Sequence, residues 1–275
     1  MSPPTVALKA ERLRALHAAP GAFVIANAWD PGSARILESL GFPALATSSG
    51  AAAGVLARRD GHITRDEALA QARAMCDATA VPVSADLEKG FGDAPEDAAE
   101  TIRRAAEAGL VGGSIEDATG DPAHPLFGFD QAVERVAAAA EAARKLPFPF
   151  TFTARAENFL RGRTDLDDTI RRLQAYERAG ADVLFAPGLP DLDAVRTVCA
   201  SVRKPVNFMV GIRGKSFSVA ELEAAGVKRI SVATSLFRAA MTGLVHAATE
   251  VREHGTFRFL DSTLGTAELN AHWRS

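Results

Sequence analysis

Two carboxylates, Asp86 and Glu116, each end an apolar segment of the chain. If those segments are neighbouring strands of a parallel sheet, both side chains point into the same mouth, only a few ångströms apart. Two ionised carboxylates that close repel one another unless a cation lies between them or they share a proton. Because oxygen ligands favour a hard, hydrated ion, the pair predicts a Mg2+ site, or one for Mn2+, with Glu88 or Asp60 assisting. An ion pair of either carboxylate with a nearby Lys or Arg is the other interpretation.

Three further polar groups lie at or near the ends of apolar segments. The guanidinium of Arg155 could bind a substrate carboxylate or oxo group through two parallel hydrogen bonds, or could pair with Glu157 or Glu116. The backbone amides of the run 47–52, Thr-Ser-Ser-Gly-Ala-Ala, could cradle a carboxylate or phosphate oxygen, or the run could form a tight packing turn. Asn207 could bind a substrate oxygen or hold a loop.

The elements that position these residues alternate between strand and helix. Eight apolar segments predict strands at Ala22–Ala28, Pro43–Ser48, Val81–Asp86, Val111–Glu116, Pro149–Arg155, Asp182–Pro187, Pro205–Val210 and Arg229–Thr234. The gaps between them predict helices at 32–40, 65–79, 95–108, 130–145, 167–179, 191–202 and 218–225. This alternation predicts an α/β fold in which a parallel sheet closes into a (β/α)8 TIM barrel. A doubly wound open sheet is the alternative, but the chain has neither GxGxxG after the first strand nor GxxxxGK(S/T) anywhere.

Length and composition fit one barrel domain over residues 1–275, with 235–275 as a C-terminal helical extension. The net charge of −3 gives no basic surface for nucleic acid. No polybasic run and no apolar stretch of about 18 residues indicates a membrane. The first residues show no secretion-type pattern, so we expect a cytoplasmic protein. Cys76 and Cys199 lie in predicted helices without CxxC spacing, and we expect reduced thiols.

A helical tail follows the eighth predicted strand. A long helix is predicted at Ser235–Glu253, and a short helix at Thr266–His272. Phe257, Phe259 and Trp273 make this tail apolar enough to dock on another surface. We expect the tail to pack either on its own barrel or on a neighbouring subunit.

The order of motifs along the chain resembles the isocitrate lyase/phosphoenolpyruvate mutase superfamily from about residue 8 to residue 245. The motifs are NAWDPGSA, TSSGAAAG, ARRDGHIT, VSADLEKGFGD, GGSIEDATG, FTARAEN, ADVLFAPG and PVNFM. The resemblance implies a Mg2+-dependent barrel that acts on small 2-oxo acids and makes or breaks C–C or P–C bonds through a metal-stabilised enolate. It also implies that the eighth helix is exchanged between subunits, which gives a homo-oligomer, either a dimer or a homotetramer.

The same resemblance assigns roles to particular residues. It puts the metal near Asp86 and Glu116, with Asp60 matching the acidic residue that the family has after strand two. It places the substrate carboxylate on the segment Ser48, Ser49 and Gly50, and the oxo oxygen beside the metal and Arg155. Trp29 and Asn207 would then line the pocket.

The chain also departs from the family pattern. Lyases and mutases usually have Asp-x-Asp at the end of strand three, whereas this chain has Ser84-Ala85-Asp86, so Glu88 is the expected replacement. The loop 118–128 lacks the Lys-(Lys/Arg)-Cys-Gly-His motif of the isocitrate and methylisocitrate lyases, and standard isocitrate lyase activity is therefore not expected. It also lacks the Lys and Asn-Ser elements of the phosphonomutases. Pro187 or its neighbour falls where those families offer Glu or His on strand six.

The leading hypothesis is a carbon–carbon lyase of a small 2-oxo dicarboxylate, for example an oxaloacetate decarboxylase, with Arg155 and Glu116 as catalytic residues. His124 is the candidate proton donor of the loop after strand four, although a lone loop histidine is more often a surface residue. Two alternatives stay open. One is a 2-oxo acid binding protein with little turnover, and the other is a phosphonopyruvate-type C–P hydrolase or mutase.

Overall fold

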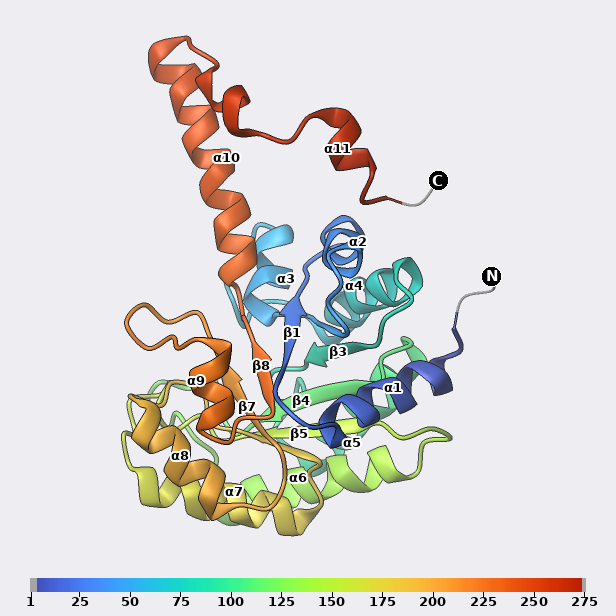
Figure 1. Ribbon diagram of the computed structural model, residues 1–275. Helices are drawn as coiled ribbons and strands as arrows, with labels where there is room; N and C mark the ends of the chain where they lie inside the picture. Colours follow the sequence, from blue (N-terminus) through green and yellow to red (C-terminus); the bar gives the residue numbers. More distant parts are fainter. Residues whose placement is uncertain (1–3, 274–275) are drawn as a thin grey trace.

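Within residues 4–273, which the computed structural model describes, eight parallel strands close into one barrel in chain order, with β8 paired to β1 (Figure 1). The strands are β1 Phe23–Asn27, β2 Leu45–Ala46, β3 Val83–Asp86, β4 Gly112–Glu116, β5 Thr151–Arg155, β6 Val183–Phe185, β7 Val206–Met209 and β8 Arg229–Ser231. The predicted (β/α)8 barrel is therefore confirmed, and each predicted strand contains an observed one. Residues 1–3 and 274–275 of the predicted domain lie outside the described residues.

The helices follow the strands as predicted, with three additions. The predicted helices correspond to α2 Pro31–Ser39, α4 Arg65–Ala78, α5 Pro95–Glu107, α6 Phe129–Arg144, α7 Leu166–Ala179, α8 Leu192–Ser201, α9 Val219–Ala224, α10 Ser235–His254 and α11 Thr266–Asn270. The additions are α1 Val6–Ala18, α3 Ser49–Val55 and the short 3-10 helix η1 Arg258–Ser262. The run 47–52 is predicted as a cradle of backbone amides or a packing turn, but its residues from Ser49 onward begin helix α3, whose alanines are buried.

Side-chain hydrogen bonds cap the first turns of helices that follow β1 and β2 along the chain. Asp30 caps α2 because its side chain accepts from the amide of Ser33 at 2.6 Å, while Pro31 occupies the first turn. Thr64 and Glu67 form a reciprocal capping box at the start of α4. These caps fix the connections that leave the carboxyl end of the barrel, and thereby the positions of the residues beside them.

The two ends of the barrel are built differently. Helix α1 covers the amino end, where Leu13 packs in a cluster with Ile25 and Val111. The buried amine of Lys9 donates to the carbonyl oxygens of Cys76 at 2.9 Å and Thr79 at 2.6 Å. The carboxyl end carries the ends of β3, β4 and β5, where Glu116 lies in register with Arg155. The polar residues singled out in the sequence analysis therefore lie mainly at one end.

Beyond the first turn of α10, which packs against the barrel, the tail leaves the barrel. Helix α10 projects away from the barrel, and the chain returns through η1 to α11 near α2 (Figure 1). No residue of α10, η1 or α11 is buried. The side chains of Leu244, Val245, Phe257, Leu260 and Leu264 are all more than half exposed. The tail approaches its own barrel where Ser39 Oγ lies 2.6 Å from His272 Nδ1. Among the described residues, no helix has the combination of length and apolar character needed to cross a bilayer.

Candidate active site at the carboxyl end of the barrel

Arg155 is the centre of a buried acidic cluster. Its Nη1 lies 3.0 Å from Asp86 Oδ1, and its Nη2 lies 3.2 Å from Glu116 Oε2. Glu157, which is 0% exposed, accepts from Arg155 Nη2 at 2.7 Å and from Nε at 3.1 Å. Arg161 adds a second guanidinium 3.0 Å from Glu116 Oε1. The ion pairs considered as the alternative interpretation are therefore present, but the carboxylates outnumber the arginines that contact them.

Burial and the neighbouring carboxylates raise the pKa of two carboxyl groups of this cluster. Burial, followed by repulsion from Glu157, raises the pKa of Glu116. Burial, followed by the charges of Asp86 and Asp60, raises the pKa of Glu88 to about 7. Glu88 Oε1 is buried and has no hydrogen-bond partner among the described residues. A raised pKa is expected for carboxylates that are crowded together with no cation bound between them.

These donors fit a hydrated divalent cation. Asp86, Glu88 and Glu116 offer the oxygen ligands that Mg2+ prefers, and Glu88 Oε1 is a buried acceptor that an ion or its water could satisfy. Across residues 4–273, no group of three or more His, Cys, Asp and Glu side chains forms a preassembled metal cage. Mg2+ does not need one, because it commonly binds through one or two carboxylates and keeps several waters.

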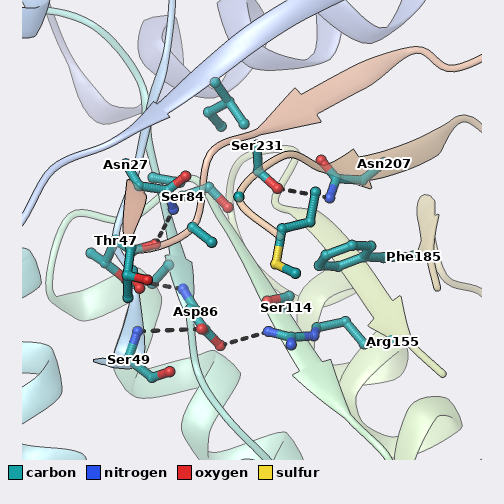
Figure 2. A pocket seen from close by; sticks show the side chains of 18 of the residues that line it. Asn27, Thr47, Ser49, Ser84, Asp86, Ser114, Arg155, Phe185, Asn207 and Ser231 are labelled. Atoms are coloured by element: carbon teal, nitrogen blue, oxygen red, sulfur yellow. Dashed lines mark hydrogen bonds and ion pairs between the residues drawn. The ribbon is translucent and has the colours of Figure 1, made fainter. Parts of the chain in front are cut away.

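Two cavities meet at this cluster. The first, of about 320 Å³, descends into the barrel, and the second, of about 650 Å³, opens around the loops above it. Ser49, Asp60, Arg155 and Leu160 line both. Figure 2 shows the lining of the deeper cavity, in which Asp86 lies between the amide of Ser49, at 3.3 Å, and the guanidinium of Arg155. The arrangement can bind a small anionic ligand close to a cation.

Most of the predicted site residues reach these cavities. The deeper cavity is lined by Ser48, Ser49, Asp60, Asp86, Arg155 and Asn207, and the upper one by Asp60, Glu88 and Glu116. Asn207 is committed to the fold, since it donates to Ser231 Oγ at 3.1 Å and accepts from Arg229 Nε at 2.8 Å. These two contacts are with strand β8 and not with a loop, and a role of Asn207 in binding a substrate oxygen stays a prediction.

Three predicted residues do not line either cavity. The ring of Trp29 packs edge-on against Phe237 at the start of α10, with centroids 5.5 Å apart. Gly50 packs closely instead, since a Cβ built on it would lie 3.0 Å from Thr234 and 3.2 Å from Asp60. The side chain of His124 is 84% exposed and pairs with Asp121 at 3.3 Å. The backbone bridge between Ala118 and Leu126 folds this loop into a small hairpin, which leaves His124 in solvent.

Sequence reasoning also missed a functional candidate. His62, within the motif ARRDGHIT, lines the upper cavity beside Asp60 and Glu88. Glu157, which the sequence indicated as a possible partner of Arg155, does hold that side chain through two hydrogen bonds. The position of Glu157 is fixed in turn, because its amide donates to Asp117 Oδ1 at 2.8 Å. The Arg-x-Glu spacing in FTARAEN was the available signal for Glu157, whereas the loop position of His62 gave none.

Beneath the cluster lies a buried network that joins α7 to the strand ends. Asp117 Oδ2 accepts from the hydroxyl of Tyr176 at 2.6 Å and from Arg172 Nη1 at 3.1 Å. Arg172 also donates to Asp168 at 2.9 Å. A fully hydrogen-bonded buried network restricts the motion of its members. This one therefore holds the segment that carries Glu157 in place.

Comparisons with known proteins agree with this geometry. The model of the phosphoenolpyruvate phosphomutase family matches residues 13–252. An oxaloacetate decarboxylase of Bradyrhizobium diazoefficiens (USDA 110) is 30% identical over 95% of this chain and 91% of its own length. A 2-methylisocitrate lyase of Escherichia coli K12 is 30% identical over 85% of this chain and 81% of its own. A solved structure from Burkholderia cenocepacia J2315, provisionally assigned as a lyase or mutase, has a TM-score of 0.95 and 54% identity, covering 97% of this chain and 95% of that one.

Proposed function

The chain belongs to the phosphoenolpyruvate phosphomutase family, within the isocitrate lyase/PEP mutase superfamily, and on this premise we propose that it is a Mg2+-dependent lyase of a small 2-oxo dicarboxylate. Enzymes of this superfamily act on C–C or C–P bonds, and this chain is one of them. Oxaloacetate decarboxylation is the concrete case, supported by the similarity to the decarboxylase from Bradyrhizobium. The observation that carries the proposal is the excess of buried carboxylates around Arg155 at the junction of two cavities.

Each part of the cluster has a distinct task. Asp86 and Glu116 would hold the cation, and Glu88 and Asp60, which line the upper cavity with Glu116, would act through its water. When bound, the divalent ion supplies positive charge that favours the negative charge developing on the oxo oxygen of the substrate. Arg155 supplies fixed positive charge beside Asp86, and Glu157 prevents its guanidinium from turning away. Substrate carboxylate binding is assigned to the Ser48 and Ser49 side of the deeper cavity.

The reaction also needs a proton source. Loss of carbon dioxide from a 2-oxo dicarboxylate leaves the bonding electron pair on the substrate, and a proton must then reach the new carbanion carbon. His62 lines the upper cavity, whereas His124 lines neither cavity, so we assign this role to His62 or to a water beside it. This assignment replaces His124 as the loop donor.

The tail belongs to the same proposal. Several of its apolar side chains are exposed on the single chain, and exposed apolar surface of this kind is typical of an interface. A second copy of this chain is the occupant we propose, through exchange of α10 in a dimer or homotetramer. Sedimentation equilibrium tests the assignment, since a monomer at micromolar concentration would contradict it. The cytoplasmic location expected from the sequence stays a prediction.

An NMR turnover screen with Mg2+ tests the function directly. Purified protein is incubated with oxaloacetate, 2-oxoglutarate, 2-methylisocitrate and phosphonopyruvate, and the loss of each compound is followed. We expect Mg2+-dependent loss of one 2-oxo dicarboxylate, abolished by Glu116→Gln and retained in Glu96→Gln, whose carboxylate is exposed on α5. Binding of these compounds without turnover would contradict the proposal and favour a binding protein. Turnover of phosphonopyruvate alone would instead indicate C–P chemistry.

A further inference from the structure

Arg229, the first residue of β8, is a buried arginine without an acidic partner. It is 5% exposed. Its Nε donates to Asn207 Oδ1 at 2.8 Å and its Nη2 to Thr153 Oγ1 at 3.0 Å, which are both neutral acceptors. Its Nη1 is buried and has no acceptor within residues 4–273. Burial and the nearby charge of Arg155 lower the pKa of Arg229 to about 9, as expected when no anion compensates a buried cation.

The other buried arginines of the described chain have anionic partners or backbone partners. Arg135 donates to the carbonyl oxygens of Ala94 and Lys89 and does not line the deeper cavity. Arg155 contacts three carboxylates, and Arg172 contacts Asp117 and Asp168. An uncompensated buried charge is strongly unfavourable, so proteins normally pair such a group or place it against a ligand. Unlike Arg155 and Arg172, Arg229 has no carboxylate partner, and unlike Arg135 it lines a cavity that an anion can enter.

The surroundings of Arg229 leave space for such an anion. Arg229 lines the cavity of about 320 Å³, together with Ser84, Ser114, Ser231 and Asn27. The interior of such a barrel is usually filled by bulky branched residues, but the three serines and Asn27 leave this one hollow and line it with polar groups. Thr153 accepts a hydrogen bond from the guanidinium of Arg229 and precedes Arg155 by two residues on β5. The guanidinium of Arg229 therefore lies at the floor of the cavity, about 7 Å below the carboxyl end of β5.

From this arrangement we propose that Arg229 is the anchor of an anion subsite at the floor of the pocket, and that it takes the second carboxylate of a dicarboxylate ligand. The reacting end of that ligand lies above it, at Asp86 and Arg155, and only this last assignment rests on the proposed function. The pocket would then carry opposite charges at its two ends. Carboxylates are in excess at the mouth, and the unpaired guanidinium of Arg229 lies at the floor. It would make the enzyme select dicarboxylates over monocarboxylates of the same length.

Equilibrium binding of matched ligands tests the subsite without turnover. Isothermal titration calorimetry compares 2-oxoglutarate with 2-oxopentanoate, and malate with 2-hydroxybutyrate, since each pair differs by one carboxylate. A charge-assisted hydrogen bond in a buried site predicts a preference of about 10- to 100-fold for the dicarboxylate in the wild-type protein. Arg229→Gln should reduce the preference to less than about 3-fold while leaving monocarboxylate affinity unchanged. Arg196→Gln, at an exposed position of α8, should keep the full preference.

Each outcome decides the proposal. An unchanged preference in Arg229→Gln would overturn it, and so would equal affinity for the two ligands in the wild-type protein, which needs no variant to fold. Competition of inorganic phosphate with the dicarboxylate supports a shared anion site. Stabilisation of wild-type protein by phosphate without competition, and with no dicarboxylate preference, would overturn the assignment to the ligand. Because turnover is not measured, failure of the subsite and failure of the proposed reaction are distinguishable.

Discussion

The amino end and the carboxyl end of the barrel satisfy their charges in opposite ways. At the amino end, Lys9 is enclosed by backbone carbonyl oxygens, and Leu13 fills the space beneath the strands. At the carboxyl end, carboxylates crowd around Arg155, and Glu88 Oε1 is buried without a partner among the described residues. The comparison indicates that the first end is built for stability. The second end keeps an unfavourable charge distribution that only a ligand can relieve.

The largest expected effect is at the carboxyl end. Asp86→Asn removes one negative charge from the cluster, and we expect kcat/KM to fall by about 10³-fold because the site loses a cation ligand. The thermal unfolding midpoint should stay the same or rise, since repulsion between carboxylates decreases. Steady-state kinetics and thermal unfolding of the same preparation measure both. If activity and the fraction of folded protein decreased equally in Asp86→Asn, the claim that Asp86 serves activity and not stability would be contradicted.

A change at the amino end should have the opposite result, with stability reduced and activity retained. Leu13→Ala leaves a cavity under the strands, and we expect the free energy of unfolding to decrease by about 3 kcal/mol. Activity per folded molecule should be unchanged, because Leu13 is remote from Asp86. Urea denaturation together with kcat/KM at low temperature checks this expectation. Leu8→Ala, at an exposed position of the same helix, is the control that should leave both quantities unchanged.

A third comparison lies within the carboxyl end. His62→Gln should lower kcat by about 100-fold if His62 delivers the proton, whereas His124→Gln should have no effect. Measuring kcat across a pH series distinguishes loss of a proton donor from local rearrangement, because only the former removes an ionisation from the profile. Equal activity of the two variants would leave water as the proton source.

The smallest expected effect is the acid sensitivity of the amino end. Burial, followed by the charge of Arg229, lowers the pKa of His17 to about 3, below its usual value of 6.5. Because the unfolded chain binds the proton more readily, this contribution to stability is present above pH 6.5 and decreases as the pH falls towards 3. Thermal unfolding of His17→Gln should show a weaker decline over this range than wild-type protein or than His254→Gln, at the exposed end of α10. An identical decline in all three proteins would rule out this role of His17.

The sequence predicted the barrel well because apolar segments and caps are local signals. The same signals placed Asp86, Glu116 and Arg155 at one end, since strand ends are visible in the pattern. The direction of Trp29 depends on where Phe237 of α10 lies, which no local pattern contains. The helix at 49–55 was missed because Ser and Gly favour turns, and burial of its alanines overrides that preference. Arg229 begins a strand, yet its long side chain reaches a cavity in the barrel interior.

The most direct test of the account is a Mg2+ titration followed by calorimetry in the absence of substrate. We predict one binding event per chain in the wild-type protein, with Mn2+ able to replace Mg2+, and loss of that event in Asp86→Asn. Glu96→Gln should bind like the wild type, because its carboxylate lies on the surface of α5. Saturation at about 100 times Kd should also stabilise the fold by about 2.7 kcal/mol. Absence of Mg2+ binding, or binding that survives in Asp86→Asn, would contradict the claim that the carboxylate excess serves a cation.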